Sequence, residues 1–241
     1  MDLKKINSIT KYPSIYTYHQ LGERGRLNDA LTESRGFEES ESVYIYEKVD
    51  GENSRIIMLK NAEGDRIGNP YGNIADFLRP IADEIIANDQ LQGEWALKVI
   101  YQESYGGKTK ASKHYSDRNT QNYRVFDVFS LNKVELDNLM ELQLEKIAEW
   151  REHGNQPFYN EDDKQRLVQR LGLQAAPLLE VTTGSHFPIS LEDTFSNLKK
   201  FEKTQVGIEL AGKSEGIIVR TVNRNQIRKI RFEDYERTFR N

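Results

Sequence analysis

The sequence contains no cysteine, and this absence excludes disulfides, thiolate nucleophiles and cysteine-based zinc sites. Histidine is scarce as well, and none of the four histidines forms an HxH or HxxxH pair, so a histidine-rich metal site is not expected. No apolar run approaches the ~20 residues of a membrane-spanning helix, and the polar start MDLKKINSIT is not typical of a signal peptide. These absences predict a cytoplasmic globular protein without a membrane partner.

A strong net charge is also lacking, because 34 basic residues face 38 acidic ones and leave −4 on the whole chain. This balance argues mildly against nucleic acid as a partner. The charge is unevenly placed, however: residues 213–241 carry eight basic and four acidic side chains, a net +4, against −8 for the rest. The basic end favours a local anionic partner. A solvated, charged pair of C-terminal strands is the alternative.

The 241 residues, 37% of them hydrophobic and 10% aromatic, are enough for one compact domain or at most two small ones. There is no internal repeat and no Pro-rich or Gly/Ser-rich linker. Residue patterns predict helices at 74–88 (with a kink or break at Pro80), 133–152, 161–171 and 190–203. They predict strands at 42–49, 54–60, 95–101, 122–130, 178–183, 215–222 and 226–232, and a long loop at 102–120. The sum is an α+β fold of twisted antiparallel sheets flanked by helices.

The segment EKVDGEN at residues 47–53 is the first that points to chemistry. In a strand, Lys48 and Asp50 point to the same side, and the glycine after them turns the chain sharply. A lysine beside a carboxylate at a strand end is usually a surface ion pair. The alternative is a nucleophilic lysine, which burial or nearby positive charge must make neutral before it can attack.

Four further segments follow in order: GEW at 93–95, VFDV at 125–128, SEGIIVR at 214–220 and RKIR at 228–231. Each alone has an ordinary structural explanation; RKIR, for example, suits a solvated edge strand whose cations discourage aggregation. Together with KVDG, and in this order, they resemble the motif series of the covalent nucleotidyltransferases, which include ATP-dependent DNA ligases, RNA ligases and mRNA capping enzymes. The resemblance spans residues 44–232 and implies an ATP-grasp-like nucleotidyltransferase fold.

Details within the motifs favour one branch of that superfamily. DNA ligases typically place an arginine five residues beyond the nucleophilic lysine, where this chain has Asn53. KxDGxN followed by GEW and FDV resembles the RNA ligases of the nick-sealing phage and editing type, which fits an origin in a phage or bacterium. The fifth motif of that branch is commonly Lys-x-Lys, whereas this chain has Lys229 and Arg231, which keeps the charge but changes the geometry.

Those ligases usually carry a further C-terminal domain. We expect a single ligase domain over residues 1–241 without an OB or helical domain. Whether a partner protein supplies such a domain is left open.

The resemblance implies a reaction that begins when Lys48 Nζ attacks the α-phosphate of ATP, which yields lysyl-AMP and pyrophosphate. AMP would then move to a 5′-phosphate RNA end, and a 3′-hydroxyl would displace it. Because negative charge is dispersed in the transition state, the site needs cations. Lys229 and Arg231 would bind the phosphates and favour the neutral form of the lysine, and Arg220 would be a third cation. The implied catalytic group is Lys48, Asp50, Lys229 and Arg231.

Carboxylates and an aromatic ring complete the implied site. Glu215 and Asp50 would hold Mg²⁺ or Mn²⁺, in part through water. Glu94 would accept hydrogen bonds from the ribose hydroxyls. Phe126 would stack on the adenine, worth ~1–3 kcal/mol, with a core position as the alternative. The remaining nucleotide or RNA-end contacts would come from Glu47, Asn53 and one of Arg55 and Arg66, unless Arg55 pairs with a neighbouring carboxylate.

Other functions remain open: a GTP-using capping-type guanylyltransferase, a non-catalytic nucleotide- or RNA-binding module, and ligation of DNA. The cations of helices 133–152 and 161–171 favour a solvated face. The loop at 102–120 is the better candidate for contacts with RNA phosphates, through Lys108, Lys110, Lys113, His114 and Arg118.

Overall fold

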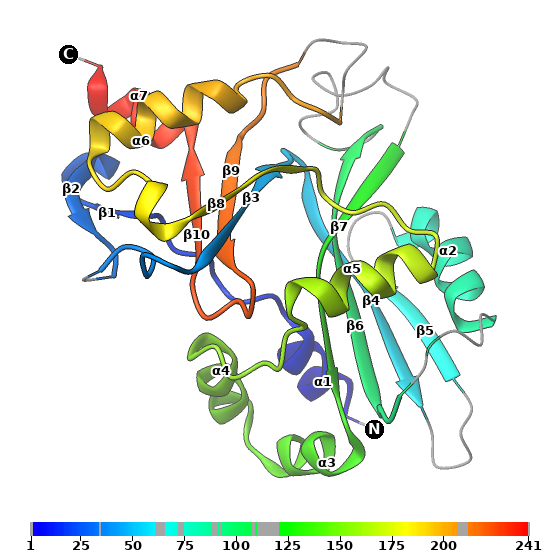
Figure 1. Cartoon of the computed structure of the whole chain (residues 1–241). Coiled ribbons are helices and arrows are strands. Elements are labelled where there is room, and N and C mark those ends of the chain that lie inside the picture. Colours follow the sequence, from blue (N-terminus) through cyan, green and yellow to red (C-terminus); the bar gives the residue numbers. More distant parts are fainter. Residues whose placement is uncertain are drawn as a thin grey trace. The chain divides into compact units, whose positions relative to one another are not determined.

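Figure 1 shows a computed structural model of the chain, which describes residues 2–33, 35–60, 66–71, 75–87, 91, 93–107, 109, 121–206 and 212–240. The chain forms two compact units, each built from three separate stretches of sequence. Unit 1 comprises residues 1–14, 52–104 and 123–175, and unit 2 comprises residues 15–51, 105–122 and 176–241. Helices and antiparallel sheets both occur, so the expected α+β class is confirmed.

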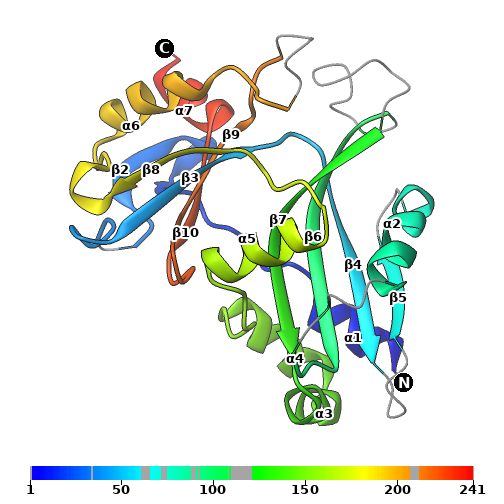
Figure 2. The same cartoon turned by 45° about the vertical axis from the view of Figure 1, so that its right-hand side comes forward.

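The sheet of unit 1 has the strand order β5-β4-β6-β7, which can be followed in Figure 2. Its strands are β4 (Glu52–Lys60), β5 (Arg66–Tyr71), β6 (Leu97–Gly106) and β7 (Gln121–Leu131). Side chains alternate along β6, so that Leu97, Val99 and Tyr101 lie on one face and Lys98 and Ile100 on the other. All five are buried. Both faces of this sheet are therefore covered, which explains the nearly continuous apolar run WALKVIY.

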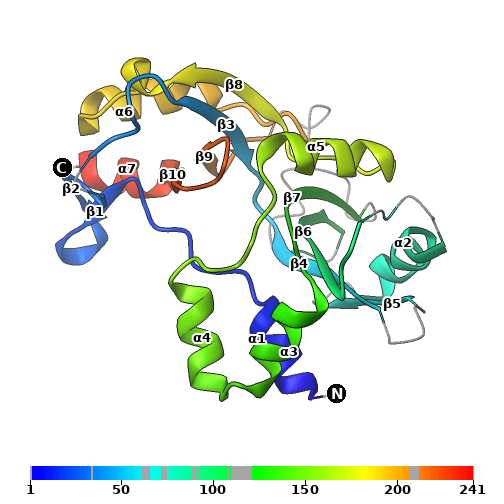
Figure 3. The same ribbon diagram turned by 60° about the horizontal axis from the view of Figure 1, so that its bottom comes forward.

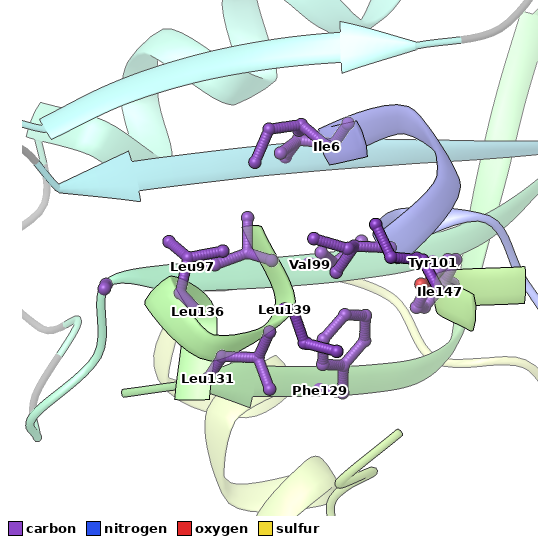
Figure 4. Close-up of a cluster of buried hydrophobic side chains, with 12 residues drawn as sticks. Ile6, Leu97, Val99, Tyr101, Phe129, Leu131, Leu136, Leu139 and Ile147 are labelled. Atoms are coloured by element: carbon purple, nitrogen blue, oxygen red, sulfur yellow. The ribbon is translucent and has the colours of Figure 1, made fainter. Parts of the chain in front are cut away.

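Three helices cover one face of the unit 1 sheet and lie close together in Figure 3: α1 (Leu3–Thr10), α3 (Lys133–Glu141) and α4 (Leu144–Glu152). Asp2 caps α1 by accepting from Lys4 N at 2.9 Å, and Asn132 and Glu135 form a capping box at the start of α3. Figure 4 shows the buried cluster that joins these helices to β6 and β7. Its labelled side chains are Ile6, Leu97, Val99, Tyr101, Phe129, Leu131, Leu136, Leu139 and Ile147.

The other face carries α2 (Ala75–Ala87) and α5 (Glu161–Arg170), whose Ala82, Ile85, Leu167 and Val168 join a second cluster with Ile100. The break expected at Pro80 does not occur, since α2 runs through it. Pro80 and the residue four positions before it are both exposed. Water can therefore satisfy the carbonyl that loses its helical partner.

Unit 2 contains a four-stranded antiparallel sheet in the order β10-β9-β3-β8 and a two-stranded sheet of β1 and β2. The strands are β1 (His19–Leu21), β2 (Leu27–Leu31), β3 (Ser42–Lys48), β8 (Leu178–Thr183), β9 (Gly216–Thr221) and β10 (Ile227–Arg231). The helices are α6 (Leu191–Leu198), which a short 3₁₀ turn η4 (Lys199–Phe201) extends, and α7 (Phe232–Phe239); two further 3₁₀ turns are η1 (Glu23–Gly25) and η3 (Gly184–His186). A core of inward side chains, among them Ile45, Val219 and Ile230, lies on one face of the larger sheet.

Several expected elements differ from the structure. The helix expected at 133–152 is two helices, because Leu142 and Gln143 are extended. A loop was expected to begin at residue 102, but β6 continues to Gly106. Gln102 and Ser104 are buried in this strand opposite β4. The loop cations from Lys108 to Arg118 lie outside the described residues. The sequence patterns missed α1, α7, β1, β2 and β5.

Within the part of the chain that the structure describes, no helix is long and apolar enough to cross a membrane.

Candidate functional site

Lys48 is the last residue of β3 in unit 2. Along this strand Val43 and Ile45 point into the core, and the pleat places Lys48 on the opposite face. Lys48 Nζ donates to Glu215 Oε2 and forms an ion pair with it, across 167 positions of sequence. The two side chains are 23% and 25% exposed. The predicted lysine and the predicted carboxylate are thus brought into direct contact by the pairing of β3 with β9.

A glycine separates Lys48 from the next cation on this face of the sheet. Gly216 pairs with Lys48 on one side and with Arg231 on the other. Its φ of +154° is rarely adopted by other residues, and a Cβ there would lie 2.1 Å from the Ile230 carbonyl oxygen. The row Lys48-Gly216-Arg231 therefore leaves the sheet bare of side-chain atoms between two basic residues, so a ligand can approach the backbone closely.

Arg231 has a partner that the sequence patterns did not indicate. Its Nε and Nη2 donate to Oδ2 and Oδ1 of Asp234 at 2.8 Å each, and the Asp234 side chain is buried. Hydrogen bonding to Asp234 raises the pKa of Arg231. Arg231 Nη1 lies 4.0 Å from Glu215 Oε1, so Glu215 has Lys48 on one oxygen and Arg231 facing the other. The signal for Asp234 was its i,i+3 spacing from Arg231 at the start of α7.

Lys229 lies two residues before Arg231 on β10, on the same face of the sheet, and pairs with Ile218. Burial lowers the pKa of Lys229, and the positive charges of Arg231 and Lys48 lower it further. Lys229 therefore lies within electrostatic range of both Lys48 and Arg231. The Lys229 backbone is fixed by Tyr16 O and Tyr18 N at 3.0 and 3.1 Å. This cluster favours anions.

Asp50 follows Lys48 by two residues and is half-buried. Within the described residues, no group of three or more His, Cys, Asp or Glu side chains is placed to hold a metal ion. Glu215 and Asp50 alone offer too few ligands for Ca²⁺, but Mg²⁺ binds through one or two carboxylates, substrate phosphates and water. The carboxylate of Glu215 therefore suits an ion that arrives together with a phosphate.

Glu47, which was expected to contact a nucleotide, directs its carboxylate into the protein. It is 2% exposed, and it accepts hydrogen bonds from Thr204 Oγ1 and from Gln205 N, the latter at 2.8 Å. Its observed contacts anchor residues 204 and 205 beside the end of β3. Arg220 is also buried, on the same sheet face as Lys229, in the row formed with Tyr44 and Ile227.

The remaining predicted residues belong to unit 1. Arg55 of β4 is 6% exposed, and its Nη2 and Nε donate to Asn7 Oδ1 at 2.5 Å and to Thr10 Oγ1 at 3.2 Å. Its guanidinium also lies 4.1 Å from the centre of the Tyr71 ring. Burial lowers the pKa of Arg55. The neighbouring carboxylate considered as an alternative partner is not the one observed; Arg55 bonds to polar groups of α1, and these contacts fasten that helix to the sheet.

Phe126 of β7 is half-buried and packs its ring edge-on against Tyr12 with 5.0 Å between centroids. Tyr101, which lies directly opposite Arg55 in the sheet, is its other aromatic neighbour at 6.2 Å. Part of the Phe126 ring therefore packs in the core, as considered in the alternative, and part of it stays accessible. Glu94 and Asn53 are exposed, and Arg66 begins β5 with its side chain outside the described residues.

Comparison with known proteins identifies one family. Residues 41–232 match the family model described as RNA ligase. No curated protein sequence matches the chain.

The solved structures that resemble the chain include several forms of the RNA ligase of Naegleria gruberi. A glutamate-to-alanine mutant with ATP and Mn superposes with a TM-score of 0.57 at 12% identity, over 95% of this chain and 58% of that one. The form with pyrophosphate has a TM-score of 0.53 at 13% identity, over 94% and 63%. A lysine-to-methionine mutant with AMP and Mn has 0.53 at 12%, over 93% and 62%. At these identities the likeness concerns the fold, which is that of the nucleotidyltransferase domain, and the chain spans about three fifths of the length of these neighbours.

Proposed function

Because the chain belongs to the RNA ligase family, we propose that it is an ATP-dependent RNA ligase that forms a lysyl-AMP intermediate on Lys48. In the first step Lys48 Nζ forms a bond to the α-phosphorus of ATP, and the bond to the bridging oxygen breaks to release pyrophosphate. AMP then passes to a 5′-phosphate RNA end. A 3′-hydroxyl attacks that 5′-phosphate and expels AMP, which joins the two ends.

The observation that carries this proposal is the cluster around Lys48. A reactive lysine needs a group that takes its proton and cations that receive the phosphates. Glu215 contacts Nζ directly, and Arg231 pairs with the same glycine as Lys48. Lys229 is near enough for its charge and that of Lys48 to repel. An ordinary surface ion pair would not collect two further cations on one face of a sheet.

The ion pair represents the resting state of the nucleophile, because an ammonium group has no free electron pair. Glu215 is placed to take a proton from Nζ and to pass it on to water, so that its carboxylate is charged again when the divalent cation binds. When the triphosphate arrives, its negative charge replaces the lysine as the partner of the two remaining cations. Lys48 would then be released from its ion pair at the moment when the α-phosphate is bound beside it.

We assign the divalent cation, Mg²⁺ or Mn²⁺, to Glu215, with Asp50 as a second or water-mediated carboxylate. The bound ion would polarise the phosphate oxygens as a Lewis acid. The solved Naegleria gruberi RNA ligase with ATP and Mn supports this choice of nucleotide and ion. The chain spans only 58% of the length of that protein. The first step needs only ATP and the cluster around Lys48, whereas the joining steps also need two RNA ends held in line.

By resemblance to the RNA ligases, several further residues would contact the nucleotide. Phe126 would stack on the adenine through the part of its ring that stays accessible, and exposed Glu94 and Asn53 would meet the ribose and phosphates. Arg66 is the better candidate than Arg55 for a substrate contact, because Arg55 already binds α1.

The test is incubation of the chain with ATP or GTP labelled at the α-phosphate, with Mg²⁺ or Mn²⁺, followed by a denaturing gel. We expect label from ATP only, and none in Lys48→Met. Lys133→Met is the matched control, since Lys133 is exposed and paired with Asp137 in unit 1. Label from GTP alone would identify a capping-type enzyme, and no label from either would identify a non-catalytic module.

A chase of the labelled protein with nicked duplexes that carry a 5′-phosphate then separates the later steps. RNA, DNA and hybrid nicks, and single-stranded RNA, are compared for loss of label from the protein and for joined product. Loss of label without joining would mean that the ends need a further protein to be held in line. Label that persists with every RNA end would contradict the ligase assignment.

A further inference from the structure

A second basic site lies in unit 2, at the end of α6. Residues around η4 line a surface hollow of about 390 Å³, and all the side chains that line it are charged. The lining residues are Lys199, Lys200, Glu202, Lys203, Gly212 and Lys213. Four lysines and one glutamate give the hollow a net charge of +3. Its volume lies within the range of ligand sites, but no apolar side chain is found among the described residues that line it, unlike most small-molecule sites.

The lysines differ in how they are paired. Lys213 Nζ lies 3.0 Å from Glu202 Oε1 and 2.7 Å from Glu236 Oε1, so its charge is balanced. For the other three lysines, no ion pair is found among the described residues. Lys199 instead holds its ammonium 4.3 Å from the centre of the Phe195 ring. The hollow thus presents three cations that the described acidic side chains do not neutralise.

The backbone that carries these lysines is well ordered by hydrogen bonds. Thr204 N donates to Gly212 O at 3.0 Å, and Ser214 N donates to Glu202 O at 2.8 Å. This bridge sets Lys203 directly opposite Lys213. Because Lys213 already has two carboxylate partners, a polyanion laid across this bridge would act mainly on Lys203.

The same segment is attached to the strand of the nucleophile. Thr204 is buried, and it donates through Oγ1 to Glu47, the residue before Lys48. Gln205 N donates to the other oxygen of the same carboxylate. Glu47 therefore couples the edge of the basic hollow to the end of β3 by two hydrogen bonds.

We infer that this hollow binds the phosphodiester backbone of the RNA substrate; the inference rests on the proposed function for the identity of the polymer. Lysine is a flexible point charge suited to phosphate contacts that do not read sequence. Among the described residues no aromatic side chain lines the hollow, which favours contacts with phosphates over stacking of bases. The hydrogen bonds to Glu47 attach this segment to β3 on the sheet face opposite Lys48, so RNA held in the hollow would lie outside the Lys48 cluster.

The experiment compares the full chain with the triple variant K199Q/K200Q/K203Q. Binding of a fluorescent, 5′-phosphorylated single-stranded RNA is measured from 50 to 200 mM salt, and lysyl-AMP formation is measured separately. The control K4Q/K133Q/K146Q removes the same three charges from exposed lysines of unit 1. Loss of three phosphate contacts lowers the slope of log affinity against log salt by about 2. Over this fourfold range of salt, the parent should therefore lose roughly 15-fold more affinity than the triple variant.

The expected result is a lower slope and weaker RNA binding for the triple variant alone, with lysyl-AMP formation within about twofold of the parent. An equal effect of the control variant would overturn the inference, because general charge would then explain the binding. Loss of lysyl-AMP formation in the triple variant would also overturn it, since the hollow would then serve the nucleotide. A parent chain that forms no lysyl-AMP contradicts the proposed function, while the RNA-binding arm still tests the hollow independently.

Discussion

Replacing Asp234 with asparagine tests whether the Arg231–Asp234 pair holds the cation in place for the reaction. The parent pair is bidentate, with two hydrogen bonds of 2.8 Å to a carboxylate whose residue is 1% exposed. Asparagine keeps one acceptor oxygen and turns the other into an NH₂ group, which faces a guanidinium N–H as donor against donor. The change removes one charge-assisted hydrogen bond and the full negative charge, at almost constant volume.

The magnitude follows from the exposure of the two partners. A hydrogen bond to a charged group contributes about 1.5–3 kcal/mol, and breaking a fully buried ion pair costs about 3–5 kcal/mol. The Arg231 side chain is 27% exposed, so water can solvate part of the released guanidinium. We therefore expect a loss of about 2 kcal/mol in the free energy of unfolding. At an m-value of about 3 kcal/mol/M, the urea midpoint falls by roughly 0.7 M.

The released arginine should also change the chemistry. Arg231 Nη1 is 4.0 Å from Glu215 Oε1 in the parent, and without its own carboxylate it should move onto Glu215. It would then compete with Lys48 for the proton acceptor. We expect lysyl-AMP formation to slow roughly tenfold, which corresponds to about 1.4 kcal/mol in the barrier.

The assay combines urea unfolding with the rate of lysyl-AMP formation at saturating ATP. Both tryptophans, Trp95 and Trp150, lie in unit 1, so unfolding must also be followed by far-UV circular dichroism to report on unit 2. The matched control is Glu233→Gln, which removes one negative charge at the neighbouring position. The Glu233 side chain is 64% exposed and paired with Arg237. It should change stability by less than about 0.5 kcal/mol. Equal effects of the two substitutions on stability and rate would refute the reasoning.

Three further predictions concern other parts of the structure. Gly216→Ala should lower the free energy of unfolding by roughly 3 kcal/mol or more and abolish lysyl-AMP formation, because the added Cβ would meet the Ile230 carbonyl oxygen at 2.1 Å. The control is Gly154→Ala, where φ is +74° but nothing lies within 4 Å of the added Cβ. It should lower the free energy of unfolding, measured by thermal unfolding, by only about 1 kcal/mol. Burial and neighbouring cations lower the pKa of Lys229 below its usual 10.5, so between that lowered pKa and 10.5 the unfolded chain holds more protons at this site and its contribution to stability rises with pH. Pyrophosphate binding should accordingly take up a proton in that window, as titration calorimetry in buffers of different ionisation enthalpy would register, and Lys229→Arg should remove the uptake. Arg55→Ala should lower the melting temperature because contacts with α1 are lost, by about 2–4 °C for each kcal/mol of stability in a chain of this size. The folded fraction should keep its lysyl-AMP activity. Loss of activity without a change in melting temperature would place Arg55 in the substrate site instead.

The strands that carry the Lys48 cluster were predictable because local patterns specify them. Expected strands at 42–49, 215–222 and 226–232 correspond to β3, β9 and β10 within a residue or two at their ends. Alternating and β-branched residues such as those of EGIIVR are a local signal. The pairing of Lys48 with Gly216 and of Gly216 with Arg231 is not local, and only the resemblance to a family suggested that these segments meet.

The partners of Arg231 and Arg55 could not be predicted from the sequence, because they depend on which elements lie next to each other in space. Arg231 was expected to be free for phosphate, but its partner Asp234 becomes available only because α7 starts directly after β10. The apolar spacing of Phe232, Tyr235 and Phe239 does suggest a helix, but the charges between them made the segment resemble a solvated strand end. The choice between Arg55 and Arg66 stayed open because α1 was not anticipated. Without that helix, the partners of Arg55, Asn7 and Thr10, could not be predicted.

If Lys48 is the nucleophile proposed above, the interleaved course of the chain also governs when the reaction can begin during synthesis. The chain changes unit after Ser14, Gly51, Ser104, Asn122 and Ala175. Strand β3 emerges early but finds both its sheet neighbours, β8 and β9, only after residue 178. Until then Lys48 has neither its proton acceptor nor its cations, so a nascent or truncated chain that ends before Glu215 should consume no ATP. Under the proposed mechanism, the order of translation keeps Lys48 inert until β9 and β10 have been made.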